Sequence, residues 1–283
     1  MSAPTLIYVP RDAAALAMDA DTVARDIERM ADQRGLSVQV VRNGSRGLLW
    51  LEPLVEISTP EGRLAYGPVQ PEDVPALFDA GWLAGGAHPL RQGLTEEIPY
   101  LKQQERLTFA RVGVIDPLSL QDYAAHGGLQ GLKRALAMEP AAIVEEVVTS
   151  GLRGRGGAAF PTGIKWKTVL GSPADRKYIV CNADEGDSGT FADRLLMEGD
   201  PYVLIEGMTI AGLAVGATYG YIYVRSEYPQ AIEALDSLSR APISASILPQ
   251  MTMTSAPSSA AIRFTVRTYA LSPVMPSSST LQT

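Results

Sequence analysis

A glycine-rich, basic stretch at residues 150–169, SGLRGRGGAAFPTGIKWKTV, restricts what this chain can fold into. Glycine loses more backbone freedom on folding than any other residue, so five glycines in twenty positions predict a sharp turn or a close approach to a ligand. Residues 154–159, GRGGAA, match the dinucleotide pattern GxGxxA, which is specific only between a strand and a helix. The preceding residues 140–151 have helical periodicity instead, and we expect no helix to begin readily at FPTG (160–163). An ordinary Rossmann unit is therefore disfavoured.

The side chains of the same stretch favour an anionic ligand with a planar ring. Basic groups beside exposed backbone N–H groups attract phosphate, and aromatic rings offer flat apolar faces for stacking. The basic residues are Arg153, Arg155, Lys165 and Lys167, and the aromatic residues are Phe160 and Trp166. The alternative interpretation is a surface turn whose basic residues are incidental.

A second polar cluster, NADEGDSG at residues 182–189, follows an apolar strand predicted from residue 177. Ligand sites of α/β proteins lie at the carboxyl ends of strands, and carboxylates there repel phosphate but accept hydrogen bonds from hydroxyl or N–H groups. The alternative is a polar turn or a capping cluster for the next helix. Calcium binding is less attractive because the spacing lacks the later ligands of an EF-hand loop. Cys181, beside this cluster, is interpreted as a buried core residue.

Composition excludes several classes of function. A net charge of −7 argues against nucleic-acid binding, which needs a basic surface. A single cysteine, Cys181, can neither form a disulfide within the chain nor hold an iron–sulfur cluster alone. We see no signal peptide and no apolar run of about 18 residues, so we expect no membrane-spanning segment and a cytoplasmic protein.

Residues 1–90 predict a thioredoxin-like domain, with elements in the order β-α-β-β-(β)-α. The predicted strands are 5–9, 37–42, 48–52, 54–59 and 63–67, and the predicted helices are 20–35 and 71–85. Redox-active relatives of this fold carry CxxC or cluster cysteines, and none is present before Cys181. We therefore expect a structural or docking role.

Three further segments follow along the chain. Residues 91–115 are interpreted as an extended connector, and residues 116–236 alternate helices and strands as an α/β domain. Residues 237–283 contain no Gly, Asp, Glu or Lys but eleven Ser, six Thr and five Pro. We interpret this segment as an aberrant, disordered tail produced by a lost reading frame near residue 237. A natural disordered tail is the alternative.

The motifs of residues 115–236 resemble the NADH-binding flavoprotein subunit of respiratory complex I. The resemblance rests on SGLRGRGGAAFPTGIKWKTV, YIVCNADEGDSGTFADRLLMEGDPYVLIEGMTIAGLAVGA and YGYIYVRSEYPQAIEAL, in that order. The same module occurs in diaphorase subunits of NAD-linked hydrogenases and in beta subunits of NAD-dependent, molybdenum-containing formate dehydrogenases. The cysteine-free front domain points most toward the formate dehydrogenase subunit. The implied fold is an incomplete α/β FMN/NAD-binding domain of the complex I flavoprotein type, distinct from a standard Rossmann fold.

The resemblance also implies roles for individual residues. In the family, the glycine loop lines a joint FMN and NAD(H) site, an aromatic residue stacks on the nicotinamide nucleotide, and a lysine contacts FMN. The matching positions here are Gly154, Arg155, Gly156, Gly157 and Gly163 for the loop, Phe160 for the stacking ring and Lys165 for the lysine. Residues matching Asn182, Asp184 and Glu185 hold FMN, and an acid matching Asp187 faces NAD.

The implied activity is hydride transfer between nicotinamide and FMN, followed by single-electron transfer into a cluster chain. Implied partners are a molybdenum-containing alpha subunit and a [2Fe-2S] gamma subunit. The full-length family continues with a GAYxCGEE loop and the cysteines of a [4Fe-4S] cluster, and none of these motifs follows residue 236. The alternatives are a non-catalytic truncated subunit or docking module, or the equivalent subunit of complex I or of a NAD-linked hydrogenase.

Overall fold

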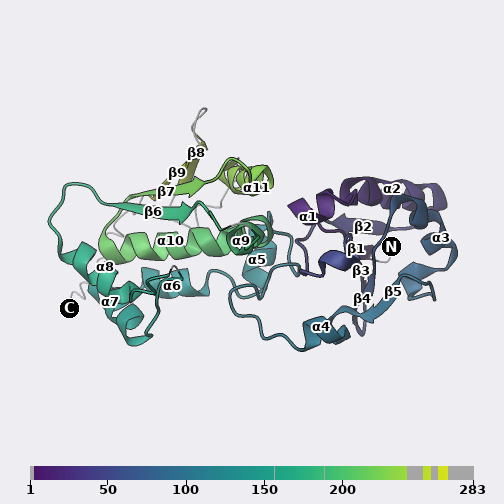
Figure 1. The fold of residues 1–283 in the computed structure, drawn as a ribbon, viewed down its shortest axis with the longest axis horizontal. Helices are drawn as coiled ribbons and strands as arrows, with labels where there is room; N and C mark the ends of the chain where they lie inside the picture. Colours follow the sequence, from purple (N-terminus) through teal and green to yellow (C-terminus); the bar gives the residue numbers. More distant parts are fainter. Residues whose placement is uncertain (1–2, 156, 188, 241–250, 256–260, 267–283) are drawn as a thin grey trace, which may run out of the picture.

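The N-terminal unit is built on a mixed five-stranded sheet with the order β2-β1-β3-β4-β5 (Figure 1). Strands β1 and β2 are parallel, while β3 and β4 are antiparallel to their neighbours. The computed structural model describes residues 3–155, 157–187, 189–240, 251–255 and 261–266. The strands are β1 (Thr5–Tyr8), β2 (Val38–Val41), β3 (Val55–Thr59), β4 (Gly62–Tyr66) and β5 (Arg91–Leu94). This strand order confirms the thioredoxin-like fold.

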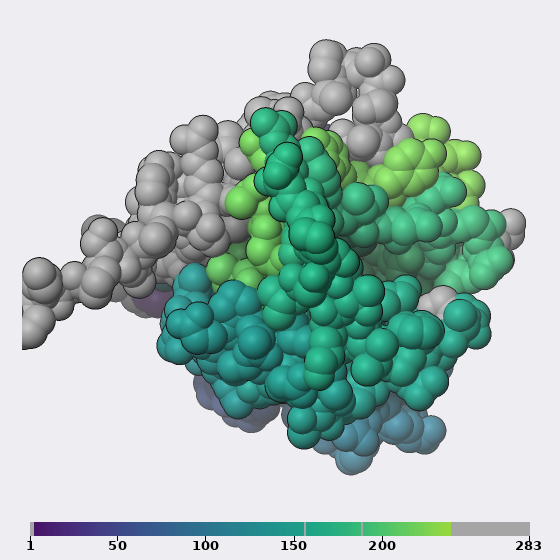
Figure 2. All heavy atoms as spheres, turned by 90° about the vertical axis from the view of Figure 1, so that its left-hand side faces the viewer, coloured from purple at the N-terminus to yellow at the C-terminus, as the bar shows by residue number. Residues whose placement is uncertain are grey.

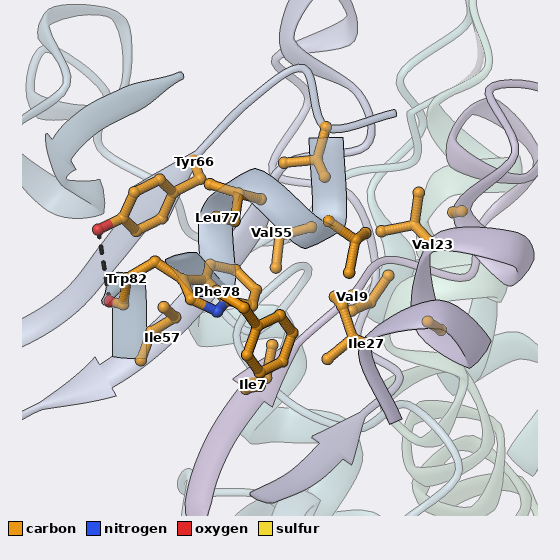
Figure 3. Close-up of a cluster of buried hydrophobic side chains, with 14 of the residues drawn as sticks. Ile7, Val9, Val23, Ile27, Val55, Ile57, Tyr66, Leu77, Phe78 and Trp82 are labelled. Atoms are coloured by element: carbon orange, nitrogen blue, oxygen red, sulfur yellow. Dashed lines mark hydrogen bonds between the residues drawn. The ribbon is translucent and has the colours of Figure 1, made fainter. Parts of the chain in front are cut away.

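Short helices surround this sheet. They are α1 (Ala13–Leu16), α2 (Ala20–Arg34), η1 (Leu49–Leu51), η2 (Pro71–Asp73), α3 (Val74–Asp79), η3 (Trp82–Ala84), η4 (Thr95–Glu97) and α4 (Pro99–Lys102). The amphipathic helix α2 buries Val23 and Ile27 against the sheet, as its 3.6-residue periodicity predicts. Trp82 is fully buried and meets Tyr66 and Phe78 edge to face (Figure 3). The N-terminal unit thus has its own hydrophobic core.

Three predictions for this part of the chain were wrong. Residues 48–52 form the short helix η1 instead of a strand. The predicted helix 71–85 is divided into η2, α3 and η3. Gly81 adopts a left-handed conformation between α3 and η3, and Gly85 does so at the end of η3. The segment 91–115 is not wholly extended: it begins with β5, which pairs antiparallel with β4, and contains α4.

The second unit places a four-stranded sheet, β6-β7-β9-β8, beside a layer of helices. Its helices are α5 (Leu120–Ala125), α6 (Gln130–Leu136), α7 (Pro140–Thr149), α8 (Thr162–Gly171), α9 (Ala192–Gly199), α10 (Pro201–Val215) and α11 (Pro229–Arg240). Its strands are β6 (Tyr178–Ala183), β7 (Tyr219–Val224), β8 (Met251–Ser255) and β9 (Ala261–Val266). The apolar helix α10 packs against β6, β7, α6, α7, α8 and α9. It is the central element of the α/β unit.

Part of the segment predicted to be a disordered tail contains regular structure. Helix α11 continues to Arg240, and β9 pairs antiparallel with both β7 and β8. Residues 251–255 and 261–266 are rich in the Thr, Val, Ile and Phe residues that favour strands. The expectation of an unstructured tail therefore differs from the fold in these residues. The remainder, 241–250, 256–260 and 267–283, lies outside the described residues, and the origin of the segment in a lost reading frame stays a prediction.

Polar contacts join the two units. The Asn43 side-chain amide donates to the Gly113 carbonyl at 2.7 Å, and the Ala13 N–H donates to Glu198 Oε2 at 2.8 Å. A Cβ on Gly44 would lie 3.1 Å from the Gly199 Cα, so the two backbones approach closely. Within the described residues, no helix is both long enough and apolar enough to cross a membrane.

Candidate functional site

The glycine loop folds back on itself between α7 and α8. The Gly154 N–H donates to the Phe160 carbonyl at 2.9 Å, and the Thr162 N–H donates to the Leu152 carbonyl at 2.8 Å. These bonds hold the two sides of the loop together like a short antiparallel ladder, with a bridge between residues 153 and 161. Gly157 is exposed, with open space where a Cβ would be. Gly156 lies outside the described residues.

The helices on either side of the glycine loop test two predictions made from the sequence. Helix α7 precedes it, which confirms that the GxGxxA match does not follow a strand. Helix α8, however, begins at Thr162, immediately after Pro161, so the expectation that no helix begins at FPTG was wrong. Proline fits here because the residue beside a helix start needs no intrahelical N–H bond. Figure 2 views the molecule from the side where α7 and α8 lie in Figure 1.

Three basic side chains of the loop and α8 have no carboxylate partner among the described residues. Arg153 donates from Nε to the Ala159 carbonyl at 2.8 Å, and Arg155 donates from Nη1 to the Arg153 carbonyl at 2.5 Å. The Lys165 Nζ lies 5.6 Å from the centre of the Phe160 ring, which is 47% exposed. Positive charge and an open aromatic face therefore occur together, as an anionic ligand with a planar ring requires.

Three other residues singled out in this stretch have structural partners. Lys167 pairs with Glu145 of α7 at 2.6 Å, and Trp166 packs into the apolar cluster between α7, α8 and α10. Gly163 faces α7, where an added Cβ would lie 2.6 Å from the Val148 backbone nitrogen. Its lack of a side chain permits the close packing of the two helices. These residues hold α8 in place, whereas Phe160 and Lys165 face outward.

The acidic loop follows β6 at its carboxyl end, as predicted. Asn182 Oδ1 accepts a hydrogen bond from the Asp184 N–H at 3.0 Å and so shapes the turn. Asp184 and Asp187 are exposed, and no hydrogen bond engages their carboxylates among the described residues. These two groups are free to accept hydroxyl or N–H donors from a ligand.

Glu185 behaves differently from its neighbours because it is buried. Its carboxylate accepts hydrogen bonds from the N–H groups of Asp193 and Arg194, at 3.1 and 3.3 Å, and from the Tyr228 hydroxyl at 3.1 Å. The first two bonds cap the amino terminus of α9, where unpaired N–H groups favour a carboxylate. The capping interpretation left open by the sequence describes Glu185 in this structure.

Arg225 supports the same turn from the end of β7. It donates from Nη1 to the Glu185 carbonyl at 2.5 Å and pairs with Glu227 at 3.3 Å. Arg225 and Tyr228 were not predicted as site residues, although both stand in the motif VRSEY that follows a predicted strand. A polar group at the end of the neighbouring parallel strand is the signal that could have identified them.

Burial and negative charge make the surroundings of the acidic loop unfavourable to further anions. Burial and the Glu185 carboxylate raise the pKa of Asp193 above its ordinary value. Burial, assisted by Asp193, raises the pKa of the Cys181 thiol to about 11, so the thiol stays protonated at neutral pH. A protonated thiol is a poor nucleophile. Cys181 packs against the apolar core but is only partly buried, so the prediction of a buried core residue holds in part.

Helix α10 positions both the glycine loop and the acidic loop, but no polar contact joins the two loops directly among the described residues. Helix α10 packs against α7, α8, β6 and α9, which carry the loops. Among the described residues, no hydrogen bond or ion pair joins residues 151–161 to residues 182–187.

A separate cavity of about 590 Å³ lies beside Thr190 at the junction of the units, and its walls contain no predicted site residue. The described residues contain no group of three His, Cys, Asp or Glu side chains able to hold a metal.

Comparison with known proteins places both loops in one family. Residues 147–264 match the family model described as the Nuo51 FMN-binding domain. The chain is 55% identical over 134 residues to the NADP-reducing hydrogenase subunit HndC of Solidesulfovibrio fructosivorans, covering 47% of this chain and 27% of that protein. It is 52% identical over 111 residues to an NADH-quinone oxidoreductase subunit of Aquifex aeolicus, covering 39% and 26% respectively. The chain thus spans about a quarter of the length of these relatives.

Solved structures with similar folds are more distant. The NAD+-reducing [NiFe]-hydrogenase in its H2-reduced state aligns over 88% of this chain and 41% of its own, with 22% identity and a TM-score of 0.41. The wild-type thioredoxin-like [2Fe-2S] ferredoxin from Aquifex aeolicus aligns over 32% of this chain and 97% of its own, with 16% identity and a TM-score of 0.28.

Proposed function

Because residues 147–264 match the Nuo51 FMN-binding domain, we propose that the second unit binds FMN and NAD(H) as part of the electron-transfer subunit of a multi-subunit NAD-dependent oxidoreductase. The observation that carries the proposal is the match over residues 147–264, which contains both candidate loops. The free cations and the exposed ring of the glycine loop support it, as do the two unengaged carboxylates of the acidic loop.

The residues of the two loops suit different parts of such a ligand. Arg155 and Lys165 offer positive charge to phosphate, and Phe160 offers a face to a planar ring. Asp184 and Asp187 can accept hydrogen bonds from ribityl or ribose hydroxyls. FMN, when bound, would supply hydride exchange with the nicotinamide, and the protein's part is to hold the rings and exclude competing donors. No side chain of the two loops needs to act as an acid or base.

Glu185 contributes to this site indirectly. Its carboxylate oxygens are already engaged by the amino terminus of α9 and by Tyr228. We assign it to positioning the acidic loop, with Arg225 holding the same turn from β7. Direct contact between Glu185 and FMN would require breaking these bonds.

We extend the proposal to the type of complex. The thioredoxin-like unit without cysteines favours a docking role beside other subunits, which fits the beta subunit of a NAD-dependent formate dehydrogenase. Its partners would be a molybdenum-containing alpha subunit and a [2Fe-2S] gamma subunit, in the cytoplasm. The equivalent subunits of complex I and of NAD-linked hydrogenases are the alternatives, supported by the named relatives.

The proposed activity can be tested on the purified full chain. We expect added FMN to be retained, with a bound-flavin absorbance spectrum, and the loaded chain to reduce ferricyanide with NADH. Asp187→Ala should weaken retention of FMN or NADH, whereas Asp175→Ala, an exposed acid before β6, should leave it unchanged. A chain that retains no flavin yet co-purifies with partner subunits would favour the non-catalytic docking module instead.

A further inference from the structure

Strand β6 forms an open edge of the second sheet. Among the strands that the structure describes, it pairs with β7 alone. Its six residues, YIVCNA, include no charge, proline or glycine. Natural edge strands are usually protected by such residues or by bulges, because unpaired N–H and C=O groups otherwise recruit another strand. Strand β5, at the edge of the N-terminal sheet, is protected by the exposed Arg91, by Gly93 and by a register shift.

On both faces of the sheet, side chains of β6 remain accessible to solvent. On the face toward α10, Ile222 and Val224 of β7 are fully buried, whereas Ile179 and Cys181 of β6 are only partly buried. On the opposite face, Val180 is 66% exposed. Tyr178 and Tyr223 extend the exposed face at 46% and 51%. An apolar surface of this kind, continuous with an unpaired edge, is characteristic of an interaction site.

The charges at the two ends of β6 identify the kind of partner. Arg176 and Lys177 precede the strand, accompanied by Asp175, while Asp184 and Asp187 follow it. Arg176 and Asp184 are both exposed, and neither forms an ion pair among the described residues. An antiparallel copy of the same strand would place the basic end of each copy against the acidic end of the other.

Strand geometry selects one register for such a pair. A two-fold axis perpendicular to the sheet keeps side chains on their own face, so only residues of the same face can lie opposite each other. With Val180 on the axis, Arg176 lies opposite Asp184 of the second copy, and this pair occurs twice. A register centred on Ile179 places Arg176 opposite Asn182 and forms no such pair. A register centred on Cys181 places Lys177 opposite Glu185, whose buried carboxylate is already bonded to α9 and Tyr228.

We propose that a second copy of this chain docks on β6, antiparallel and with Val180 on the two-fold axis. The two sheets then join into one continuous sheet, with the α10 helices on the same face. Backbone hydrogen bonds between the edges supply affinity, and the Arg176–Asp184 pairs set the register. This inference shares Asp184 with the proposed FMN site, so its test is carried out without cofactor.

A charge exchange tests the register directly. Sedimentation equilibrium of the full chain should show a reversible dimer. Arg176→Asp and Asp184→Arg should each weaken the dimer by at least about tenfold, because each substitution creates a like-charge contact at both symmetry-related positions. The double variant should restore the dimer, because each copy then offers the opposite charge to its partner. A wild-type chain that stays monomeric at all concentrations, or a double variant as weak as the single ones, would overturn the proposal.

Disulfide cross-linking provides a second measurement, which can trap the dimer even when its affinity is low. In a Cys181→Ser background, Val180→Cys should form a disulfide dimer on mild oxidation, because opposed residues of antiparallel strands lie within about 4.5–5.5 Å between Cα atoms. The matched control is Tyr223→Cys, exposed on the same face but on β7. Cross-linking of both variants to the same extent would indicate random collision and contradict the register.

Discussion

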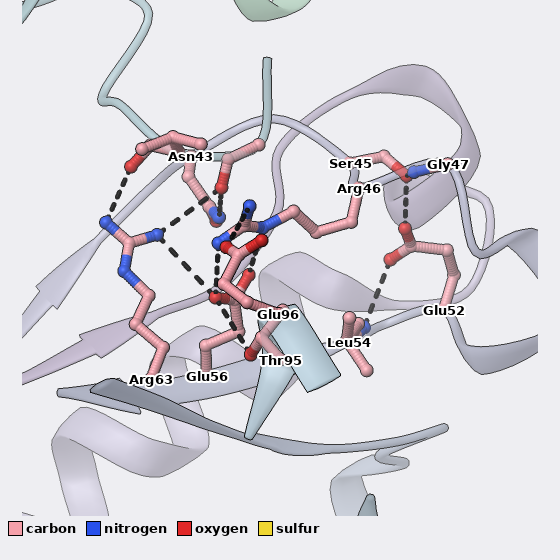
Figure 4. Close-up of polar contacts among 12 residues, drawn as sticks. Asn43, Ser45, Arg46, Gly47, Glu52, Leu54, Glu56, Arg63, Thr95 and Glu96 are labelled. Carbon is pink, nitrogen blue, oxygen red and sulfur yellow. Dashed lines mark hydrogen bonds and ion pairs between the residues drawn. The ribbon is translucent and has the colours of Figure 1, made fainter. Parts of the chain in front are cut away.

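The two units of this chain differ in where they place particular charged side chains. In the N-terminal unit, one ion pair is buried: Glu56 accepts hydrogen bonds from Arg46 Nε and Nη2, both at 2.9 Å (Figure 4). In the second unit, the exposed side chains of Lys165 and Asp184 form no hydrogen bond or ion pair among the described residues, and β6 pairs with β7 alone there. The comparison indicates that the buried pair stabilises the first unit, whereas the exposed groups of the second unit are available to a ligand.

The largest effect is expected from breaking the buried network of the N-terminal unit. Glu56→Ala leaves Arg46, with its side chain 6% exposed, without its bidentate partner and also removes the neighbour of Arg63. Removing one partner of a buried ion pair destabilises a protein by about 3–5 kcal/mol. Chemical denaturation should show this loss.

The matched control is Glu97→Ala, because Glu97 pairs with Lys102 at the exposed surface of the same unit. Such pairs contribute about 0–1 kcal/mol. Equal effects of the two substitutions would show that the network of Figure 4 does not stabilise the scaffold.

A second expected effect concerns pH at the junction between the units. Burial, with the Asp12 charge adding to it, raises the pKa of Glu198 to about 7, while Arg194 partly opposes the shift. A carboxyl whose pKa is raised by folding contributes stability that is complete below its unfolded pKa, about 4.5, and is lost as the pH rises through about 7. Glu52, whose pKa burial also raises to about 7, acts in the same direction.

Glu198→Gln isolates this contribution, because the amide oxygen can still accept the hydrogen bond from the Ala13 N–H. The free energy of unfolding of the variant should decline less between pH 5 and 8 than that of the natural chain, by up to about 3 kcal/mol. Parallel pH profiles for the two proteins would contradict the assignment to Glu198.

A smaller effect on the free energy of unfolding should distinguish two glycines of the predicted site, Gly163 and Gly157. Gly163→Ala inserts a methyl group against the Val148 backbone and should destabilise the second unit by about 1–3 kcal/mol, as overpacking does. Gly157→Ala meets open space and should change the free energy of unfolding by less than about 1 kcal/mol. Thermal unfolding distinguishes them, and the reverse order would mean that Gly163 does not serve helix packing.

Local patterns predicted much of this structure, and tertiary contacts decided the rest. The spacing of Val23 and Ile27 predicted the helix 20–35, because helical spacing is a property of a single segment. The order of this helix and the predicted strands then indicated the thioredoxin-like fold. The packing role of Gly163 depends on Val148 of another helix and left no local signal. Glu185 could be interpreted as ligand or cap, since only the fold brings Tyr228 beside it.

The same distinction explains the remaining differences. Arg225 supports the acidic loop from a strand 40 residues away, so its role follows from parallel pairing of β6 and β7. Composition alone suggested an unstructured segment after residue 236, whereas β9 pairs with β7 and β8. Which strands pair with β9 depends on the topology of the sheet, and amino-acid composition does not reveal it.

The central claim is that the exposed groups of the second unit bind FMN, and a titration of FMN into the full chain tests it most directly. Lys165 and Lys167 offer a matched pair on α8: the first is unpaired beside Phe160, and the second is paired with Glu145. We expect FMN binding to quench the flavin fluorescence with saturation. Lys165→Gln should weaken the affinity for FMN by about tenfold, because one phosphate contact is lost. Lys167→Gln should leave the affinity unchanged. No saturable binding, or equal loss in both variants, would contradict the claim.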